Sequence, residues 1–369
     1  MNKARVIAFY LPQYHPIPEN DKYWGKGFTE WTNVAKAKPL FRGHYQPHIP
    51  ADLGFYDLRL PEVREAQAEL ARDAGIEGFC YYHYWFGNGK MLLQKPFEEV
   101  LRLGKPDFPF CLCWANHDWT TKTWVKGSSM VNNTMIAQQE YLGEQDDIKH
   151  FEYCLRAFKD HRYITIEGKP IFLIYDPLSF PNVKEFMNRW NFLAKKNNLK
   201  GIYFIGVTTG RQSSYKIVTN LGFDGVCHNR RWEAEAKAAG FRFVRRMQSL
   251  LGWHLGISLM KYDYNKVVRN YDTPENKLEN CYPVITPGFD RTPRAGRRAG
   301  IYVNSSPKNF KKHVAEVCKS IQDKDDDHRL VFLSAWNEWG EGNYMEPDLK
   351  WGHGYLEAVS YTHLTLPTI

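Results

Sequence analysis

The sequence has no apolar run long enough to span a lipid bilayer, and with a mean hydropathy of −0.54 we expect no stable insertion into a membrane. Cysteine is scarce and unpatterned. Seven cysteines are scattered over 369 positions, and the spacing of Cys111 and Cys113 fits neither a redox motif nor a zinc site. The first five residues lead directly into an apolar run, which leaves no room for a secretory signal. These absences predict a globular, cytoplasmic protein.

Concentrated positive charge and phosphate-binding loops are missing as well. The net charge of +8 is spread along the chain without a helix rich in lysine and arginine, so we expect no nucleic-acid partner. The sequence has no P-loop or Ser-His-Asp elbow, and no glycine-rich turn follows the first two apolar runs. The acidic run Asp325–Asp327 lies in the polar turn before the last predicted strand, on the wrong face of the barrel for a metal site. We therefore expect neither a metal nor an organic cofactor. The modest positive charge still permits an anionic substrate or a location at a membrane surface.

Aromatic residues, in contrast, are abundant. They make up 15% of the chain, with 12 tryptophans and 22 tyrosines. Several tryptophans stand next to Asn, Asp, His or Glu, as in carbohydrate clefts, where a flat ring stacks on a sugar and polar side chains bind its hydroxyl groups. Packing in the hydrophobic core is the alternative explanation for Tyr10, Trp31, Trp114 and Trp119. The aromatic content therefore favours a sugar ligand.

Short apolar runs alternate with longer amphipathic stretches, which is the pattern of a parallel sheet wrapped in helices. The predicted strands are Val6–Leu11, Gly78–Tyr84, Phe110–Trp114, Ile171–Tyr175, Ile202–Val207, Gly225–His228, Pro283–Thr286 and Leu330–Trp336. The predicted helices are Leu60–Ala74, Ile148–Lys159, Val183–Lys196, Phe241–Leu251 and Lys308–Ile321. These repeats predict a single-domain (β/α)8 TIM barrel over residues 1–358. A doubly wound open sheet is the alternative, and the missing glycine-rich turn disfavours it.

The barrel interpretation predicts where the functional residues lie, because such barrels place them in the loops that follow the strands. The residues after the predicted strands are aromatic, amide or charged, whereas the opposite loops, such as 75–77 and 221–224, have ordinary turn residues. The candidate substrate-binding residues from the functional loops are Tyr10, Gln13, Tyr14, Trp31, His83, Tyr84, Trp114, Asn116, Asp118, Trp119, Tyr175, Asp176, Asp290 and Arg294.

The strongest motif follows the last predicted strand. The segment Trp336–Gly342 reads Trp-Asn-Glu-Trp-Gly-Glu-Gly and sets two carboxylates among tryptophans. Breaking a glycosidic bond usually needs a proton donor beside a second carboxylate, so Glu338 and Glu341 are the candidate acid/base pair. Ordinary helix capping and ion pairing is the alternative for these glutamates. The further substrate-binding candidates in this stretch are Trp336, Asn337, Trp339 and Glu346.

Two other clusters have less specific patterns. His44 and His48 are spaced like a ligand pair, but Pro47 prevents the helix that would align their rings, so we expect no metal there. A structural role is the alternative for His83, as it is for the other loop histidines. The loop of residues 290–298 contains Asp290 and four arginines. It is either a solvated face or, beside the barrel mouth, a grip for a carboxylate or phosphate of the substrate.

Four segments together carry a resemblance to a known family. They are Ala8–Pro16, Gly27–Asn33, Tyr45–His48 and Trp336–Gly342. From about residue 5 to residue 358 the chain resembles the glycoside hydrolase family 99-like, WbsX-type proteins. Many of these proteins lie in bacterial lipopolysaccharide and capsule loci and are named glycosyltransferases on that association. The likeness to the retaining endo-α-mannosidases of family 99 is concentrated in the closing motif and in the Pro287–Asp290 segment.

The resemblance implies a (β/α)8 barrel that acts on a polysaccharide or oligosaccharide without a metal. In family 99 the first glutamate of the pair takes the proton of the sugar 2-hydroxyl, whose oxygen then attacks C1 and gives a 1,2-anhydro sugar. The second glutamate protonates the leaving oxygen and later activates water. By resemblance these roles fall on Glu338 and Glu341, respectively.

Two other functions stay open. A glycosyltransferase of lipopolysaccharide or capsule biosynthesis is favoured by the predicted cytoplasmic location, since such glycans are assembled on carrier lipids inside the cell. The missing nucleotide-phosphate loop disfavours it. A catalytically silent glycan-binding barrel would keep the aromatic residues but would need no carboxylate pair.

The end of the chain does not follow the barrel pattern. Beyond Ala358 the sequence shows no amphipathic stretch of the kind that should close the barrel. We therefore expect the last helix to be missing and residues 359–369 to be a truncated or non-native tail.

Overall fold

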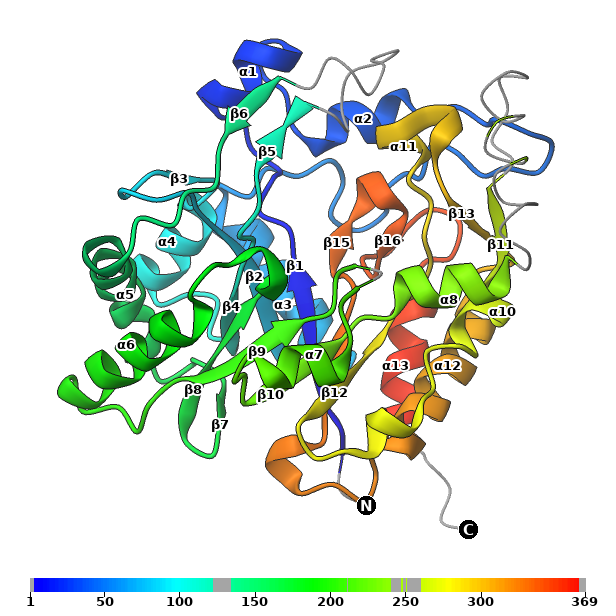
Figure 1. The fold of residues 1–369 in the computed structure, drawn as a ribbon. Helices are drawn as coiled ribbons and strands as arrows, with labels where there is room; N and C mark the ends of the chain where they lie inside the picture. The colour runs from blue at the N-terminus through cyan, green and yellow to red at the C-terminus, as the bar shows by residue number, and fades with distance from the viewer. Residues whose placement is uncertain are drawn as a thin grey trace.

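Eight parallel strands close into a barrel at the centre of the molecule (Figure 1). The computed structural model describes residues 3–121, 134–210, 212–239, 247, 250 and 260–364. The barrel strands are β1 (Arg5–Tyr10), β2 (Gly78–Trp85), β4 (Phe110–Trp114), β8 (Lys169–Ile174), β9 (Tyr203–Val207), β10 (Gly225–His228), β12 (Cys281–Ile285) and β14 (Leu330–Leu333). Each strand pairs in parallel with its neighbours, and β1 pairs with both β2 and β14, which closes the sheet. The predicted barrel and its strands are confirmed.

The strands are apolar on both faces because one face fills the barrel interior and the other lies under helices. Every residue of β4, β9 and β14 is buried. Inside the barrel the ring of Phe9 stacks between those of Tyr82 and Phe332, with centroid distances of 5.5 and 5.4 Å. All seven cysteines are free and buried, as expected for small apolar side chains. The continuous apolar runs of the sequence therefore become a packed core.

Helices surround this barrel. They are α3 (Pro61–Asp73), α4 (Lys95–Leu103), α5 (Glu144–Phe158), α6 (Val183–Lys196), α7 (Tyr215–Asn220), α8 (Arg231–Ala238), α10 (Tyr264–Val268), α12 (Pro307–Ser320) and α13 (Gly354–Leu364). The helices predicted over 60–74, 148–159, 183–196 and 308–321 are confirmed as α3, α5, α6 and α12. Most of the predicted helix Phe241–Leu251 lies outside the described residues. Within the described ranges, no helix has both the length and the apolar character needed to cross a membrane.

Small elements collect over the carboxyl ends of the barrel strands, at the top of Figure 1. They are α1 (Pro18–Trp24), α2 (Glu30–Lys36), β3 (Met91–Leu92), β5 (Trp119–Thr120), β6 (Met135–Ala137), β11 (Lys261–Asp263), α11 (Thr292–Ala295), β13 (Ile301–Val303), β15 (Asn337–Glu338) and β16 (Asn343–Tyr344). At the other end β7 (Thr165–Ile166) only extends β8 through a short antiparallel turn. The predicted difference between the two ends of the barrel is therefore present in the fold.

The expectation that the last helix is missing is wrong. Helix α13 begins at Gly354, continues past Ala358 to Leu364 and packs beside α12. Its residues Leu356 and Val359 are buried, and the ring of Tyr355 lies 5.7 Å from that of Phe310. The apolar and polar residues of α13 do not separate cleanly around the helix, which is why periodicity missed it. That residues 359–369 form a non-native tail stays a prediction.

The packing of α13 makes Leu356 a test of this last helix. We expect Leu356→Ala to lower the free energy of unfolding by about 2–5 kcal/mol, because it removes buried methyl groups from α13. Urea unfolding followed by circular dichroism measures the change. The exposed neighbour Glu357 provides the matched control, and Glu357→Ala should unfold like the parent protein. Equal unfolding curves for both variants would contradict the packing of α13.

Candidate active site

The segment after the last barrel strand sets both glutamates of the closing motif on one turn. Strands β15 and β16 form an antiparallel hairpin, and the 3₁₀ turn Trp339–Glu341 connects them. Side chains three residues apart in a 3₁₀ turn project in the same direction, so Glu338 and Glu341 face the same space. Gly342 ends the turn with a φ of 55°, a left-handed conformation that favours glycine.

One guanidinium group binds this pair together with a third carboxylate. Arg294 of α11 places Nη2 at 2.7 Å from Oε2 of Glu338 and Nη1 at 2.9 Å from Oε1 of Glu341. Its Nε donates a hydrogen bond of 2.7 Å to Oε1 of Glu30, a fully buried residue at the start of α2. The three carboxylates therefore come from loops that follow β1 and β14, and the arginine comes from the loop that follows β12.

Gly340 is the residue that allows this close assembly. A Cβ atom at position 340 would lie 1.6 Å from Oε1 of Glu30 and 2.9 Å from Nε of Arg294. Any side chain there would collide with the ion pair itself. The glycine between the two glutamates of the motif is thus required by the packing of Glu30 and Arg294 against the turn.

Burial and the nearby arginines give the two glutamates different ionisation. Removal from water raises the pKa of Glu338 to about 7, against the opposing attraction of Arg294. Glu341 experiences the same burial, but the positive charges of Arg294, Arg291 and Arg231 outweigh it and hold the pKa of Glu341 below its usual value. At neutral pH Glu338 therefore gains and loses a proton readily, whereas Glu341 is ionised.

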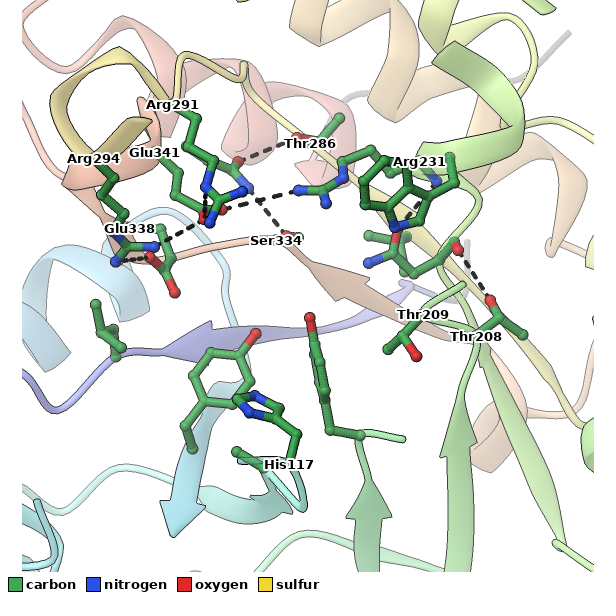
Figure 2. A pocket seen from close by; sticks show the side chains of 18 of the residues that line it. His117, Thr208, Thr209, Arg231, Thr286, Arg291, Arg294, Ser334, Glu338 and Glu341 are labelled. Carbon is green, nitrogen blue, oxygen red and sulfur yellow. Dashed lines mark hydrogen bonds and ion pairs between the residues drawn. The ribbon is translucent and has the colours of Figure 1, made fainter. Parts of the chain in front are cut away.

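The pair lines a cavity of about 330 Å³ at the carboxyl ends of the strands (Figure 2). All eight barrel strands contribute to its wall, β2 through residues of the strand itself and the other seven through residues that follow them. The lining residues are Leu11, Gln13, Tyr82, Tyr84, Ala115, His117, Asp118, Trp119, Thr120, Tyr175, Thr208, Thr209, Asn229, Arg231, Trp232, Tyr271, Val284, Thr286, Arg291, Arg294, Ser334, Glu338, Glu341 and Asn343. This volume lies at the small end of the range for ligand sites.

Several candidates from the sequence meet in this cavity. Besides Glu338 and Glu341, they are Gln13, Tyr84, Asp118, Trp119, Tyr175 and Arg294. Aromatic rings and charged groups thus share one wall, the combination that a sugar ring and its hydroxyl groups require.

Other candidates form a support under the turn that carries Glu338 and Glu341. The side chain of Asn337 bridges the backbone of Leu11, accepting a hydrogen bond of 2.7 Å from its N–H and donating one of 3.0 Å to its carbonyl. The hydroxyl of Tyr14 donates to the backbone carbonyl of Asn337. These bonds tie the turn after β14 to the loop after β1, so both residues position the glutamates from below rather than line the cavity.

Glu346 is also a supporting residue. It is buried, and it accepts hydrogen bonds from Trp339 Nε1 at 2.6 Å, Gln67 Nε2 at 2.6 Å and the Tyr56 hydroxyl at 2.9 Å. Burial raises the pKa of Glu346 to about 7 despite these bonds. Trp339 also stacks on Tyr344 with a centroid distance of 3.7 Å. Glu346 therefore fixes Trp339, and through it the turn that carries the pair.

Not every candidate substrate-binding residue lines this cavity. His83 faces His150, with 2.8 Å between their Nε2 atoms, and Trp114 donates to the carbonyl of Trp85. Asp290 accepts from Gln46 and contacts His44 beside a second cavity. The candidates that do not line the cavity are Tyr10, Tyr14, Trp31, His83, Trp114, Asn116, Asp176, Asp290, Trp336, Asn337, Trp339 and Glu346. Most of them are buried, because large aromatic side chains at strand ends also fill the core.

Within the described residues one group has the composition of a metal site. Its members are His83, His150 and Cys154, whose ligand atoms lie within 4.8 Å of one another. The two histidines already share a hydrogen bond, and burial lowers the pKa of His83 to about 3, so both rings are neutral. This group lies between β2 and α5, away from the carboxylate pair.

Sequence reasoning did not predict several polar residues that line the cavity. Thr208 and Thr209 follow β9, Asn229 and Arg231 follow β10, and Thr286 follows β12. Their positions at the ends of predicted strands, or just after them, were a usable signal. Threonine and asparagine are common in ordinary turns, however, so their residue type gave no indication of a site.

The ion cluster around Arg294 generates a stability prediction. We expect Arg294→Gln to lower the free energy of unfolding by about 3–5 kcal/mol at pH 8, because three carboxylates would lose their shared cation. Without the cation the folded-state pKa values of these carboxylates rise. The loss should therefore shrink at pH 5, where they take up protons, and grow as the pH increases.

Urea unfolding at the two pH values measures this dependence. Arg102→Gln is the control, because Arg102 forms an exposed pair with Glu99 and should change stability little at either pH. A loss in Arg294→Gln that is equal at pH 5 and pH 8 would contradict the assigned charge states.

Comparison with protein families gives one match over nearly the whole chain. The family model described as "Glycosyltransferase WbsX" matches residues 6–359. Proteins from two strains of Xanthomonas campestris pv. campestris, each called "Uncharacterized protein WxcX", are 34% identical over 367 residues, which is 99% of this chain. The chain spans about half the length of these relatives, 50% of each.

Solved structures share the fold at low sequence identity. Two structures of the GH99 endo-alpha-mannosidase from Bacteroides thetaiotaomicron align with TM-scores of 0.57 and 0.52 at 15% and 16% identity, over 97% of this chain and 96% of theirs. A "Glycoside hydrolase-like protein" aligns with a TM-score of 0.58 at 15% identity, over 99% of this chain and 95% of its own. These likenesses support the (β/α)8 barrel.

Proposed function

This chain belongs to the WbsX glycosyltransferase family of carbohydrate-active enzymes, and we propose that it is a glycoside hydrolase that cleaves a bacterial polysaccharide or oligosaccharide through Glu338 and Glu341. The observation that carries the proposal is the carboxylate pair. Two adjacent glutamates line one cavity, and their surroundings push their pKa values in opposite directions. Opposite shifts within a pair are typical of acid/base catalysis.

The first step uses Glu338 as the base. Its pKa of about 7 matches neutral conditions, where a positioned base is most effective. Glu338 takes the proton of the sugar 2-hydroxyl, the freed oxygen attacks C1, and the bond from C1 to the leaving oxygen breaks. Glu341 gives a proton to that leaving oxygen. The product of this step is a 1,2-anhydro sugar.

The second step reverses the proton transfers. Glu341, now ionised, takes a proton from water as the water oxygen attacks C1 and the bond between C1 and O2 of the anhydro sugar breaks. Glu338 returns its proton to O2, so the anomeric configuration is retained overall. Three arginines favour the ionised form of Glu341, which suits this second step. The first step requires its protonated form, and for that some of the surrounding positive charge must be offset.

A glycosyltransferase of lipopolysaccharide or capsule biosynthesis is the second candidate. The name of the family favours it. The arginines in the cavity wall also suit the phosphate groups of a nucleotide-linked or lipid-linked sugar. In this reaction Glu338 or Glu341 would activate an acceptor hydroxyl instead of water.

A digestion experiment tests the hydrolase. The protein is incubated with bacterial lipopolysaccharide and capsule glycans in the absence of nucleotide sugars, and released oligosaccharides are identified by mass spectrometry. We expect release by the parent protein and a decrease of about 10²–10⁴-fold in both Glu338→Gln and Glu341→Gln. The exposed Glu357→Gln variant on α13 should release fragments at the parent rate.

Two results would contradict the hydrolase. Full activity in either cavity variant would exclude that glutamate from catalysis. Chain extension that requires added nucleotide sugars and a lipid-linked acceptor, without release in their absence, would establish the transferase.

The leaving group distinguishes the roles of the two glutamates. An aryl glycoside of the released fragment has a leaving oxygen that needs no protonation. Glu341→Gln should therefore keep near-parent rates for the first step with this substrate, whereas Glu338→Gln should lose the rate with both substrates. With the aryl substrate, which needs no proton from Glu341, kcat/KM of the parent protein should rise as the pH increases through about 7, because Glu338 must be ionised to act as a base.

Burst kinetics and a pH series on the aryl substrate provide the measurement. If Glu338→Gln kept its activity on the aryl substrate and Glu341→Gln lost it, or if kcat/KM declined as the pH increased through about 7, Glu341 would be the base and Glu338 the acid.

A further inference from the structure

Glu341 is surrounded by more positive charge than it can pair. Arg294 Nη1 lies 2.9 Å from Oε1 of Glu341, Arg291 Nε lies 3.4 Å from the same oxygen, and Arg231 Nη1 lies 4.0 Å from Oε2. Hydrogen bonds from nitrogen to oxygen extend to about 3.2 Å. Of these three arginines, Arg294 alone is within hydrogen-bond distance of the Glu341 carboxylate, and Arg231 and Arg291 contribute charge without a bond.

Arg231 is held with its guanidinium group at the cavity wall. It is the first residue of α8, directly after the loop that follows β10. Its Cζ lies 4.6 Å from the ring centre of Phe289 and 5.0 Å from that of Trp232, and such aromatic contacts keep a guanidinium plane in place. Glu235 is its other acidic neighbour, at 3.9 Å. Among the described residues, no side chain accepts a hydrogen bond from the guanidinium group of Arg231.

Arg291 approaches the same space from a different element. It follows the loop after β12, and Figure 2 shows Arg291 and Arg231 directed at Glu341 from two sides. Its side chain is 33% exposed, yet its buried Nε has no hydrogen-bond partner among the described residues. A buried guanidinium nitrogen without a bond is costly unless a ligand supplies the acceptor.

We propose that Arg231 and Arg291 form an anion subsite beside the catalytic pair, and that the substrate carries a carboxylate or a phosphate on the sugar unit that lies next to Glu341. The proposal rests on the hydrolase function and names its substrate class. Guanidinium groups bind both anions through paired N–H donors, so the two sources share one recognition chemistry. The threonine and asparagine side chains of the same wall provide hydroxyl and amide contacts to the remainder of that sugar.

This subsite also prepares Glu341 for the first catalytic step. When the substrate anion binds Arg231 and Arg291, their charge is offset and an additional negative charge lies near Glu341. Both effects favour the protonated carboxyl, the form that donates a proton to the leaving oxygen. A neutral sugar would leave Glu341 ionised between its arginines. The subsite therefore favours anionic substrates over neutral ones in the rate of turnover as well as in binding affinity.

A binding experiment tests the subsite independently of hydrolysis. Glucuronic acid, glucose 1-phosphate and glucose are titrated into the parent protein and followed by NMR. We expect at least one of the two anionic probes to bind about tenfold or more tightly than glucose, and Arg231→Gln and Arg291→Gln each to remove that advantage. Arg102→Gln, on the outer face of α4, should behave like the parent. Preference for glucuronic acid assigns a carboxylate, and preference for glucose 1-phosphate assigns a phosphate.

Equal affinity for all three probes, or an anion preference that survives in both cavity variants, would overturn the subsite. Thermal unfolding of each variant checks that it folds. If Arg231→Gln does not fold, Arg291→Gln decides, because its side chain is the more exposed of the two.

A turnover experiment separates this inference from the hydrolase proposal. The glycan found by digestion is carboxyl-reduced or dephosphorylated, and its cleavage should slow about tenfold or more. Unchanged cleavage would overturn the anion subsite and leave the hydrolase intact. Arginine-dependent anion binding without any cleavage would overturn the hydrolase and leave the subsite.

Discussion

The site depends on the guanidinium group of Arg294. Three carboxylates that would repel one another in a buried space are held together because this one cation contacts all of them. The arrangement fixes the glutamates in place and also separates their chemistry. Glu338 shares its cation with Glu30, whereas Glu341 is reached by two further arginines. Gly340 leaves the space in which this can occur. The positions of the two glutamates and the difference between their ionisation thus both arise from these ion pairs.

A second layer makes this arrangement rigid. Asn337 binds the backbone after β1, Tyr14 binds the backbone of Asn337, and Glu346 holds Trp339 from below. None of these side chains lines the cavity. Each limits the freedom of the turn that carries the pair, and positioning of this kind is a large part of what proteins contribute to catalysis.

The sequence predicted the barrel because its strands are continuous apolar runs, a signal that burial on both faces imposes. It also predicted Glu338, Glu341 and Arg294 as candidate site residues, because each is a charged residue in a loop that follows a predicted strand. Residues such as Tyr10 and Trp336 have the same composition signal, but they are buried in the core and do not line the cavity. Side-chain direction at a strand end depends on register and loop path, and neither can be read from residue type. Arg231 is the opposite case. Its residue type did not single it out, and its place in the cavity becomes clear only from contacts with residues distant in the chain, such as Glu341 and Phe289.

The pairing of β1 with β14 brings together the two parts of the chain that form the ion cluster around Arg294. Glu30 belongs to the loop after the first barrel strand, and Glu338 and Glu341 belong to the segment after the last one. A folding intermediate that lacks either strand of this seam has an arginine and part of its carboxylate set but no assembled site. Under the proposed function, activity therefore requires the pairing of β1 with β14 to be complete. An assay of activity during refolding would report barrel closure itself.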